Sequence, residues 1–396
     1  MKRTVVVIGL DAADQVLLER WMNAGYLPNL NQIRENGIYG RLNNTAKYCG
    51  VSEELASTEA LWPAFITGCS PDTTGYWDIV KYHPQSYQVS CELSDSGYDY
   101  QKYPPFYALG EDYKVAVFDQ PYTNFNNRVN GVQVLGWGGT YPYTPSASSP
   151  SNIFSEIVKK YGRNPILFND SQGWWNKPYV EWEKQALKTS IAKRSAICQE
   201  LLQRDSWDLF ITNFNETHTV GHDLYCFSDP EHPLYPTLNK GKNTLDPVLE
   251  TYKDIDRAIG DILSIAPEDA YIFCFSPHGM GLNFSDLLSQ TFLPEVLYRF
   301  SFCGKVAIAP GQVEDTLPPV ITNPVRNSWA GNIWASLYEP NPIKKLLRTW
   351  THKSFLKASK YGLRSPYSAE AEEIAMGWMP AMWFQPLWPI GNKLRL

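Results

Sequence analysis

Six apolar residues, Val5–Leu10, run directly into an aspartate, and this feature most constrains the fold. The run is continuous and rich in β-branched residues, which is typical of a parallel strand buried on both faces. Asp11 lies where the strand ends, and open α/β sheets bind ligands at the carboxyl ends of their strands. Two interpretations follow: Asp11 is a metal ligand at the sheet edge, or it caps the next helix, which would begin near Gln15.

Strand and helix patterns alternate along the rest of the chain. Further strands are predicted over 114–118, 132–135, Leu209–Phe214 and 270–275. Helices are predicted over Gln15–Asn23, 29–36 after Pro28, 60–67, 153–161, 182–203 and 249–264. This alternation predicts an α/β fold with a doubly wound, mostly parallel sheet and helices on both faces.

The 396 residues allow one large domain or two ordinary ones, and a hydrophobic content of 43% supports a sizeable core. From about Val306 the pattern becomes Pro-rich and irregular, with a basic helix over 342–351. We therefore expect an α/β core over residues 1–305. Residues 306–396 would form an irregular and helical extension packed on that core.

Charge and cysteine content exclude several classes of protein. The net charge is −6 and no basic stripe is present, which argues against a nucleic-acid partner. No stretch approaches the roughly 20 apolar residues that span a bilayer, and the start lacks the features of a signal peptide. The seven cysteines are scattered and odd in number. They are typical of free thiols in the reducing cytoplasm, where we expect the protein to be.

A hydroxyl precedes one of the predicted helices. Thr58 comes just before the helix predicted over 60–67, and the N-terminus of a helix offers unpaired N–H groups that suit an oxyanion or a phosphate. The alternative is that Ser57 or Thr58 only caps the helix.

Three of the six histidines follow predicted strands. His218 and His222 come after Leu209–Phe214 at a spacing of four, which on a helix places both imidazoles on one face and suits metal binding. His278 lies in a glycine-containing turn, residues 276–281, after the strand 270–275. Satisfied core histidines or a simple turn are the alternatives.

Strand ends that are distant in sequence converge at one edge of a doubly wound sheet, so these side chains can meet there. Asp11, His218, His222 and His278 provide one carboxylate and three imidazoles, a ligand set for Zn²⁺, or for Mn²⁺ or Fe²⁺. The hydroxyl of Thr58 beside such an ion can lose its proton and act as a nucleophile.

With these motifs in order, the chain resembles the type I phosphodiesterase/nucleotide pyrophosphatase branch of the alkaline phosphatase superfamily. The matching segments are 5–14, 58–62, 67–71, 207–222, 252–260 and 276–281. The resemblance implies that Thr58 is the nucleophile that takes a phosphoryl or sulfuryl group. It implies that Asp11 is a metal ligand, and that His222 and His278 each ligate one of two metals.

The chain departs from the family pattern at several positions. His218 and Pro277 stand where the family usually has aspartate ligands, and Thr74 stands where a histidine is common. The chain also ends at Leu396, before the region that supplies the last histidine ligand in many members. Fewer carboxylates would hold a second ion more weakly, so either one or two ions are expected.

The resemblance predicts a metal-dependent hydrolase of small phosphoric or sulfuric esters, of the phosphodiesterase kind. A transferase is equally compatible, because the nucleophile does not determine the acceptor. The alternatives are a single-metal enzyme of other chemistry and a non-catalytic, ligand-binding member of the fold.

Overall fold

The structure of the chain is a computed structural model. It describes residues 2–48, 51–55, 57–78, 81–83, 85–86, 88–90, 100–138, 146–166, 177–232, 235–239, 246–281, 293–309 and 338–350. The chain divides into two compact units. Unit 1 comprises residues 1–170, 182–228 and 244–281, and unit 2 comprises 171–181, 229–243 and 282–396. The predicted boundary near residue 305 stays a prediction, and most of the proposed extension lies outside the described residues.

Unit 1 is built on a six-stranded sheet in the order β10-β1-β9-β6-β7-β8. Its strands are β1 (Val5–Leu10), β6 (Gly110–Phe118), β7 (Val129–Leu135), β8 (Ala147–Ser149), β9 (Leu209–Phe214) and β10 (Tyr271–Phe275). The first five strands in that order are parallel, and β8 pairs antiparallel with β7. The predicted α/β fold with a mostly parallel sheet is thereby confirmed.

The strand β1 lies between β10 and β9 and pairs in parallel with both. Val5 pairs with Tyr271 of β10 on one side and with Leu209 of β9 on the other. Five of the six residues of β1 are buried, as the unbroken apolar run predicts. Because the strands are parallel, the carboxyl ends of β10, β1 and β9 lie at the same edge.

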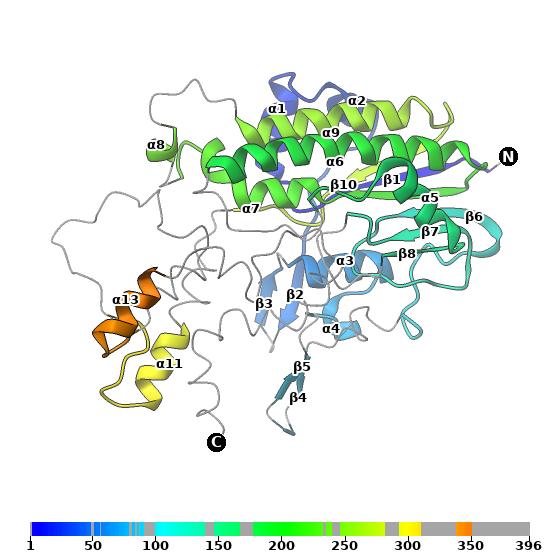
Figure 1. Ribbon diagram of the computed structural model, residues 1–396. Helices are drawn as coiled ribbons and strands as arrows, with labels where there is room; N and C mark the ends of the chain where they lie inside the picture. The colour runs from blue at the N-terminus through cyan, green and yellow to red at the C-terminus, as the bar shows by residue number, and fades with distance from the viewer. Residues whose placement is uncertain are drawn as a thin grey trace. The chain divides into compact units, whose positions relative to one another are not determined.

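Helices cover both faces of the sheet in unit 1 (Figure 1). The helices that lie wholly or mostly in unit 1 are α1 (Gln15–Asn23), α2 (Pro28–Asn36), α3 (Thr58–Thr67), α4 (Pro71–Thr74), α5 (Asn152–Tyr161), α6 (Lys177–Gln203), α7 (Glu216–Ser228) and α9 (Pro247–Leu263). On one face, Cys198 of α6 contacts Thr212 of β9 at 3.3 Å between Sγ and Oγ1. On the other face, the ring of Phe275 in β10 packs against Trp62 and Phe65 of α3.

The remaining elements are short. Two hairpins pair β2 (Thr45–Tyr48) with β3 (Val51–Glu54) and β4 (Lys81–His83) with β5 (Gln88–Ser90). Unit 2 contains α8 (Tyr235–Leu238), α11 (Leu293–Ser301) and α13 (Pro342–Trp350), the last of which confirms the predicted basic helix. In the described part of the chain, no helix has the length and apolar character of a membrane span.

Candidate functional site

Asp11 is completely buried at the carboxyl end of β1. Its backbone N–H donates to the carbonyl of Phe214 at 3.0 Å, which holds it against the end of β9. Asp14, and not Asp11, caps α1, because its Oδ1 accepts from the N–H of Leu17 at 2.8 Å. The interpretation of Asp11 as a helix cap is therefore wrong.

Three side chains surround the carboxylate of Asp11. The indole Nε1 of Trp62 donates to Oδ1 at 2.8 Å. His218 Nδ1 lies 3.4 Å from Oδ2, and His278 Nε2 lies 3.7 Å from Oδ1. Burial opposes ionisation of Asp11, but the two imidazoles and the indole bond outweigh it and hold its pKa below the usual value. The site therefore contains a buried carboxylate.

Thr58 is the first residue of α3 and its side chain points into the same group. Ser57 occupies the N-cap position without a capping bond from its side chain, and its Oγ instead donates to Glu59 Oε2 at 2.8 Å. The Oγ1 atom of Thr58 lies 2.9 Å from Nε2 of His278. The side chain of Thr58 is thus engaged with an imidazole and not with the helix backbone.

The ring of His278 has one orientation because both of its nitrogens are engaged. Nδ1 lies 2.9 Å from the carbonyl oxygen of Gly279, which can only accept, so Nδ1 carries the proton. In the neutral ring, Nε2 then accepts from the hydroxyl of Thr58. Ser276 fixes this turn, because its Oγ accepts from the N–H of Ala13 at 3.0 Å and donates to the carbonyl of His278 at 2.7 Å.

His218 and His222 lie one turn apart on α7, as the spacing predicts. Their ring centroids are 4.5 Å apart, and His222 joins the group through His218. Burial, followed by the neighbouring imidazole of His218, lowers the pKa of His222 to about 3. His222 is therefore neutral near pH 7, which is the form that ligates metals.

The donor types and distances can be compared with those of a metal site. Zn–N bonds of about 2.0–2.1 Å in a tetrahedral site place neighbouring donor atoms about 3.3 Å apart. The pairs of Asp11 with His218 and His278, at 3.4 and 3.7 Å, are close to that spacing. Among the described residues, however, no three His, Cys, Asp or Glu side chains are arranged to hold one ion. The donors fit a metal in kind and pair distance, without enclosing a common point.

Several residues of the site were not predicted from the sequence. Trp62 and Ser276 are described above, and Thr217 Oγ1 donates to the carbonyl of Asp11 at 2.5 Å. Trp62 had a detectable signal, because it lies four residues after Thr58 and so shares its face of α3. Ser276 lies in the turn 276–281 that the sequence places at a strand end, but the pattern does not predict its bonds to Ala13 and His278, and nothing in it marks Thr217.

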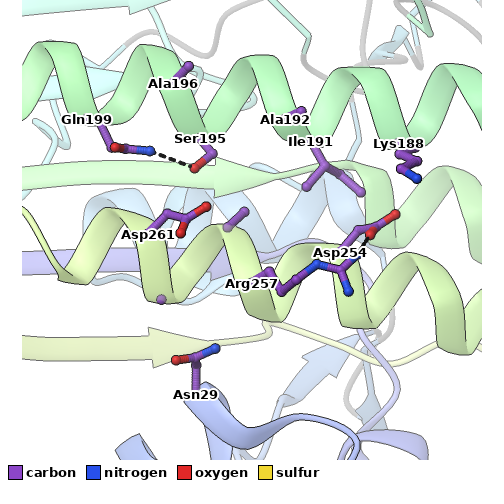
Figure 2. Close-up of a pocket in the computed structure, with 12 residues that line it drawn as sticks. Asn29, Lys188, Ile191, Ala192, Ser195, Ala196, Gln199, Asp254, Arg257 and Asp261 are labelled. Carbon is purple, nitrogen blue, oxygen red and sulfur yellow. Dashed lines mark hydrogen bonds and ion pairs between the residues drawn. The ribbon is translucent and has the colours of Figure 1, made fainter.

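A separate pocket of about 480 Å³ lies along α6 and α9. Figure 2 shows Asn29 of α2 at its edge, and Gln199 of α6 donating to Ser195 at 3.1 Å. None of the five predicted site residues lines it. The pocket and the cluster around Asp11 are therefore distinct features of unit 1.

The fold and the site together define an α/β protein with a buried carboxylate, a hydroxyl and imidazoles at the carboxyl edge of its sheet. The model of the type I phosphodiesterase/nucleotide pyrophosphatase family matches residues 5–297. The chain belongs to this family, within the alkaline phosphatase superfamily, and the predicted resemblance is confirmed.

Solved structures of phosphonoacetate hydrolase from Sinorhizobium meliloti 1021 are also similar to the chain. The complex with phosphonoformate is 15% identical with a TM-score of 0.42, and the complex with phosphonoacetate is 14% identical with a TM-score of 0.43. Each match covers 73% of this chain and 62% of the hydrolase, so this chain spans less than two thirds of that protein. No curated protein sequence matches the chain.

Proposed function

We propose that the protein is a metal-dependent hydrolase of small phosphoric or sulfuric esters, with Thr58 as the nucleophile. The observation that carries this proposal is the contact of 2.9 Å between Thr58 Oγ1 and His278 Nε2. A hydroxyl hydrogen-bonded to an oriented imidazole is the arrangement of an activated nucleophile. Membership of the type I phosphodiesterase family supports the substrate class.

Asp11, His218, His222 and His278 would hold the metal, with Thr58 beside it, and Zn²⁺ suits this donor set best. The ion would supply Lewis-acid stabilisation of the oxygens on the transferred group. Mn²⁺ and Fe²⁺ are compatible with the same ligands, and the proposal allows one or two ions. Pro277 cannot ligate through its side chain, which favours a single ion.

The chain's own residues account for the movement of the proton and the ester group. Nε2 of His278 has a single lone pair, so it serves either as a metal ligand or as the proton acceptor, not as both at once. Where Nε2 is free, it takes the proton of the Thr58 hydroxyl while Oγ1 bonds to phosphorus or sulfur and the ester oxygen of the substrate leaves; where Nε2 ligates the metal, that proton goes to water. The leaving oxygen then takes up that proton and departs as an alcohol. Water then breaks the bond to Thr58 and restores the hydroxyl, and an acceptor alcohol in place of water would give a transferase.

Two further parts of the proposal rest on other observations. A cytoplasmic location is supported by the five described cysteines, Cys69, Cys198, Cys226, Cys274 and Cys303, which are free thiols. A ligand-binding role without catalysis is the second candidate, and the replacement of carboxylate ligands at His218 and Pro277 favours it.

Metal content and turnover test the proposal together. We expect one to two equivalents of metal in the purified protein and hydrolysis of an aryl phosphodiester. Thr58→Ala should lower kcat by at least about 10³-fold, as expected for loss of a nucleophile, while Thr58→Ser keeps part of the activity. Thr58→Ala that is as active as wild type would refute the nucleophile, and inactive wild type without metal would favour the binding role.

A further inference from the structure

A second group of charges is buried beside the candidate site, and the proposed chemistry does not use it. Arg194 of α6 donates through Nε to both carboxylate oxygens of Glu216 at 3.1 Å. Its Nη1 lies 2.8 Å from Oδ2 of Asp119. The three side chains, which we call the Arg194 cluster, are each at most 1% exposed.

The cluster is held in place by contacts on every side. The guanidinium of Arg194 lies 5.3–5.7 Å from the ring centroids of Phe118, Trp137 and Phe214. Burial disfavours its charge, but Glu216 and Asp119 outweigh burial and raise its pKa above the usual value. A buried cation between two carboxylates tolerates little movement, because each charge depends on its partners.

The cluster joins the ends of three neighbouring strands. Asp119 follows β6, and its Oδ1 accepts from the N–H groups of Trp137 and Gly138 after β7 at 2.9 and 3.1 Å. Glu216 follows β9 and is the first described residue of α7. Ser190, one turn before Arg194 on α6, donates to Glu216 Oε1 at 2.5 Å.

The same helix, α7, carries two of the predicted ligands. Glu216 precedes His218 by two residues, and Thr217 between them donates to the carbonyl of Asp11 at 2.5 Å. Any rotation of this first turn would therefore move His218 and His222 relative to the carboxylate of Asp11. We propose that Arg194 and Glu216 are positioning residues that set where the two imidazoles stand at the metal site. This inference rests on the proposed function.

The test compares two buried carboxylates that each hold the start of a helix. Glu216→Gln keeps the size and one acceptor oxygen, and it leaves Arg194 paired with Asp119. We expect its dissociation constant for Zn²⁺ to rise by about tenfold, the scale found for residues that support metal ligands. Asp256→Asn in α9 is the matched control, because Asp256 accepts from the N–H groups of Asn29 and Leu30 at the start of α2. Its Zn²⁺ affinity should equal that of the wild type.

A second readout does not depend on metal or activity. In the metal-free full-length chain, Glu216→Gln should speed amide hydrogen exchange in α7 and leave β1 and α9 unchanged. Ser190→Ala, a milder change, should alter α7 in the same direction by a smaller factor. Unchanged Zn²⁺ affinity in Glu216→Gln, or exchange that rises evenly along the chain, would overturn the inference. If wild type binds no Zn²⁺, the proposed function fails while the exchange result still decides the positioning role.

Discussion

Two groups of buried charged side chains lie at the carboxyl edge of the same sheet, and the distances between their nitrogen and oxygen atoms differ. In the Arg194 cluster, the nitrogen–oxygen distances are 2.8 Å to Asp119 and 3.1 Å to Glu216. Around Asp11, the distances to the imidazole nitrogens are 3.4 and 3.7 Å. The charged groups of the first cluster therefore lie closer to one another than the carboxylate of Asp11 lies to its imidazoles.

The comparison shows that burial and charge alone do not identify a ligand site. Buried charges paired at 2.8–3.1 Å fix the elements that carry them, because loss of one partner leaves the other charge uncompensated. Donors held about 3.3 Å or more apart have the spacing of ligands around an ion. On this criterion the end of β1 has the donor spacing that the proposed metal site requires, and the ends of β6 and β7 do not.

Removal of Arg194 should have the largest effect. Arg194→Met leaves two buried carboxylates without their cation, which is expected to lower the free energy of unfolding by about 3–5 kcal/mol. Urea unfolding followed by circular dichroism measures this. The triple variant with Asp119→Asn and Glu216→Gln should recover much of the loss, because no charge then remains in the cluster. Wild-type stability in Arg194→Met would break the comparison, since the cluster would then stabilise nothing.

Trp62→Phe should have the next largest effect on the free energy of unfolding, and it changes the group around Asp11. It removes the donor that lies 2.8 Å from Asp11 Oδ1 while keeping an aromatic ring against Phe275. Loss of a bond to a buried carboxylate should lower the free energy of unfolding by about 1.5–3 kcal/mol and raise the pKa of Asp11.

The control for Trp62→Phe is Trp21→Phe, since Trp21 is also buried but packs against Tyr252 and not against the site. Both variants are compared by urea unfolding at pH 7 and by Zn²⁺ titration. Only Trp62→Phe should alter the Zn²⁺ affinity. Equal affinities in the two variants would show that the indole plays no part in the site.

Much of the fold was predictable because its signals are local. The unbroken apolar run gives β1 its exact bounds, Val5–Leu10, and the amphipathic pattern gives α1 as Gln15–Asn23. The strand β6 begins at Gly110, four residues before the prediction, because its first residues are exposed and lack an apolar pattern. The hairpin strands were missed because each has only three or four residues, too few to show a period of two in the sequence.

The carboxylate and the imidazoles of the candidate site could be predicted from the sequence only because they follow predicted strands. Parallel strands bring Asp11, His218 and His278 to one edge, and the structure places them together there. The partners of Arg194 could not be read from the sequence, because nothing in α6 indicates which carboxylates lie above it. Asp11 and Asp14 are three residues apart, and only the backbone geometry decides which one caps α1.

The pH dependence of the free energy of unfolding tests whether His222 is neutral in the folded chain, unlike the charged side chains of the Arg194 cluster. Burial lowers the pKa of His222 from 6.5 to about 3 in the folded chain. Below pH 6.5 the unfolded chain binds a proton that the folded chain does not, so stability is full above pH 6.5 and falls toward pH 3.

In metal-free wild type the contribution of His222 is at most about 1.4 kcal/mol per pH unit over that window. Urea midpoints at pH 7, 6 and 5, measured with a chelator, should therefore fall less steeply in His222→Gln than in wild type. Identical slopes in the two proteins would mean that His222 is protonated in the folded chain, which conflicts with its role as a neutral ligand.

Gly221→Ala should have the smallest effect on the free energy of unfolding. It should still alter metal binding at the group around Asp11. Gly221 lies on α7 between His218 and His222, and a Cβ there would come within 2.5 Å of Met280 Sδ. The Met280 side chain is flexible, and alanine favours a helix by up to about 1 kcal/mol over glycine, so the change in stability should be under about 1 kcal/mol.

The effect of Gly221→Ala should instead appear in metal binding, because Met280 belongs to the same turn as His278 and must shift to admit the new methyl group. A rise of several-fold in the dissociation constant for Zn²⁺ is expected, measured by titration at pH 7. Gly260→Ala in α9 is the matched control, since its Cβ would meet the Asn29 side chain at 2.6 Å, away from the site. If both alanine variants weaken Zn²⁺ binding equally, the turn that carries His278 has no special part in the site. If only Gly221→Ala does so, contact between α7 and that turn helps to fix where the imidazoles lie.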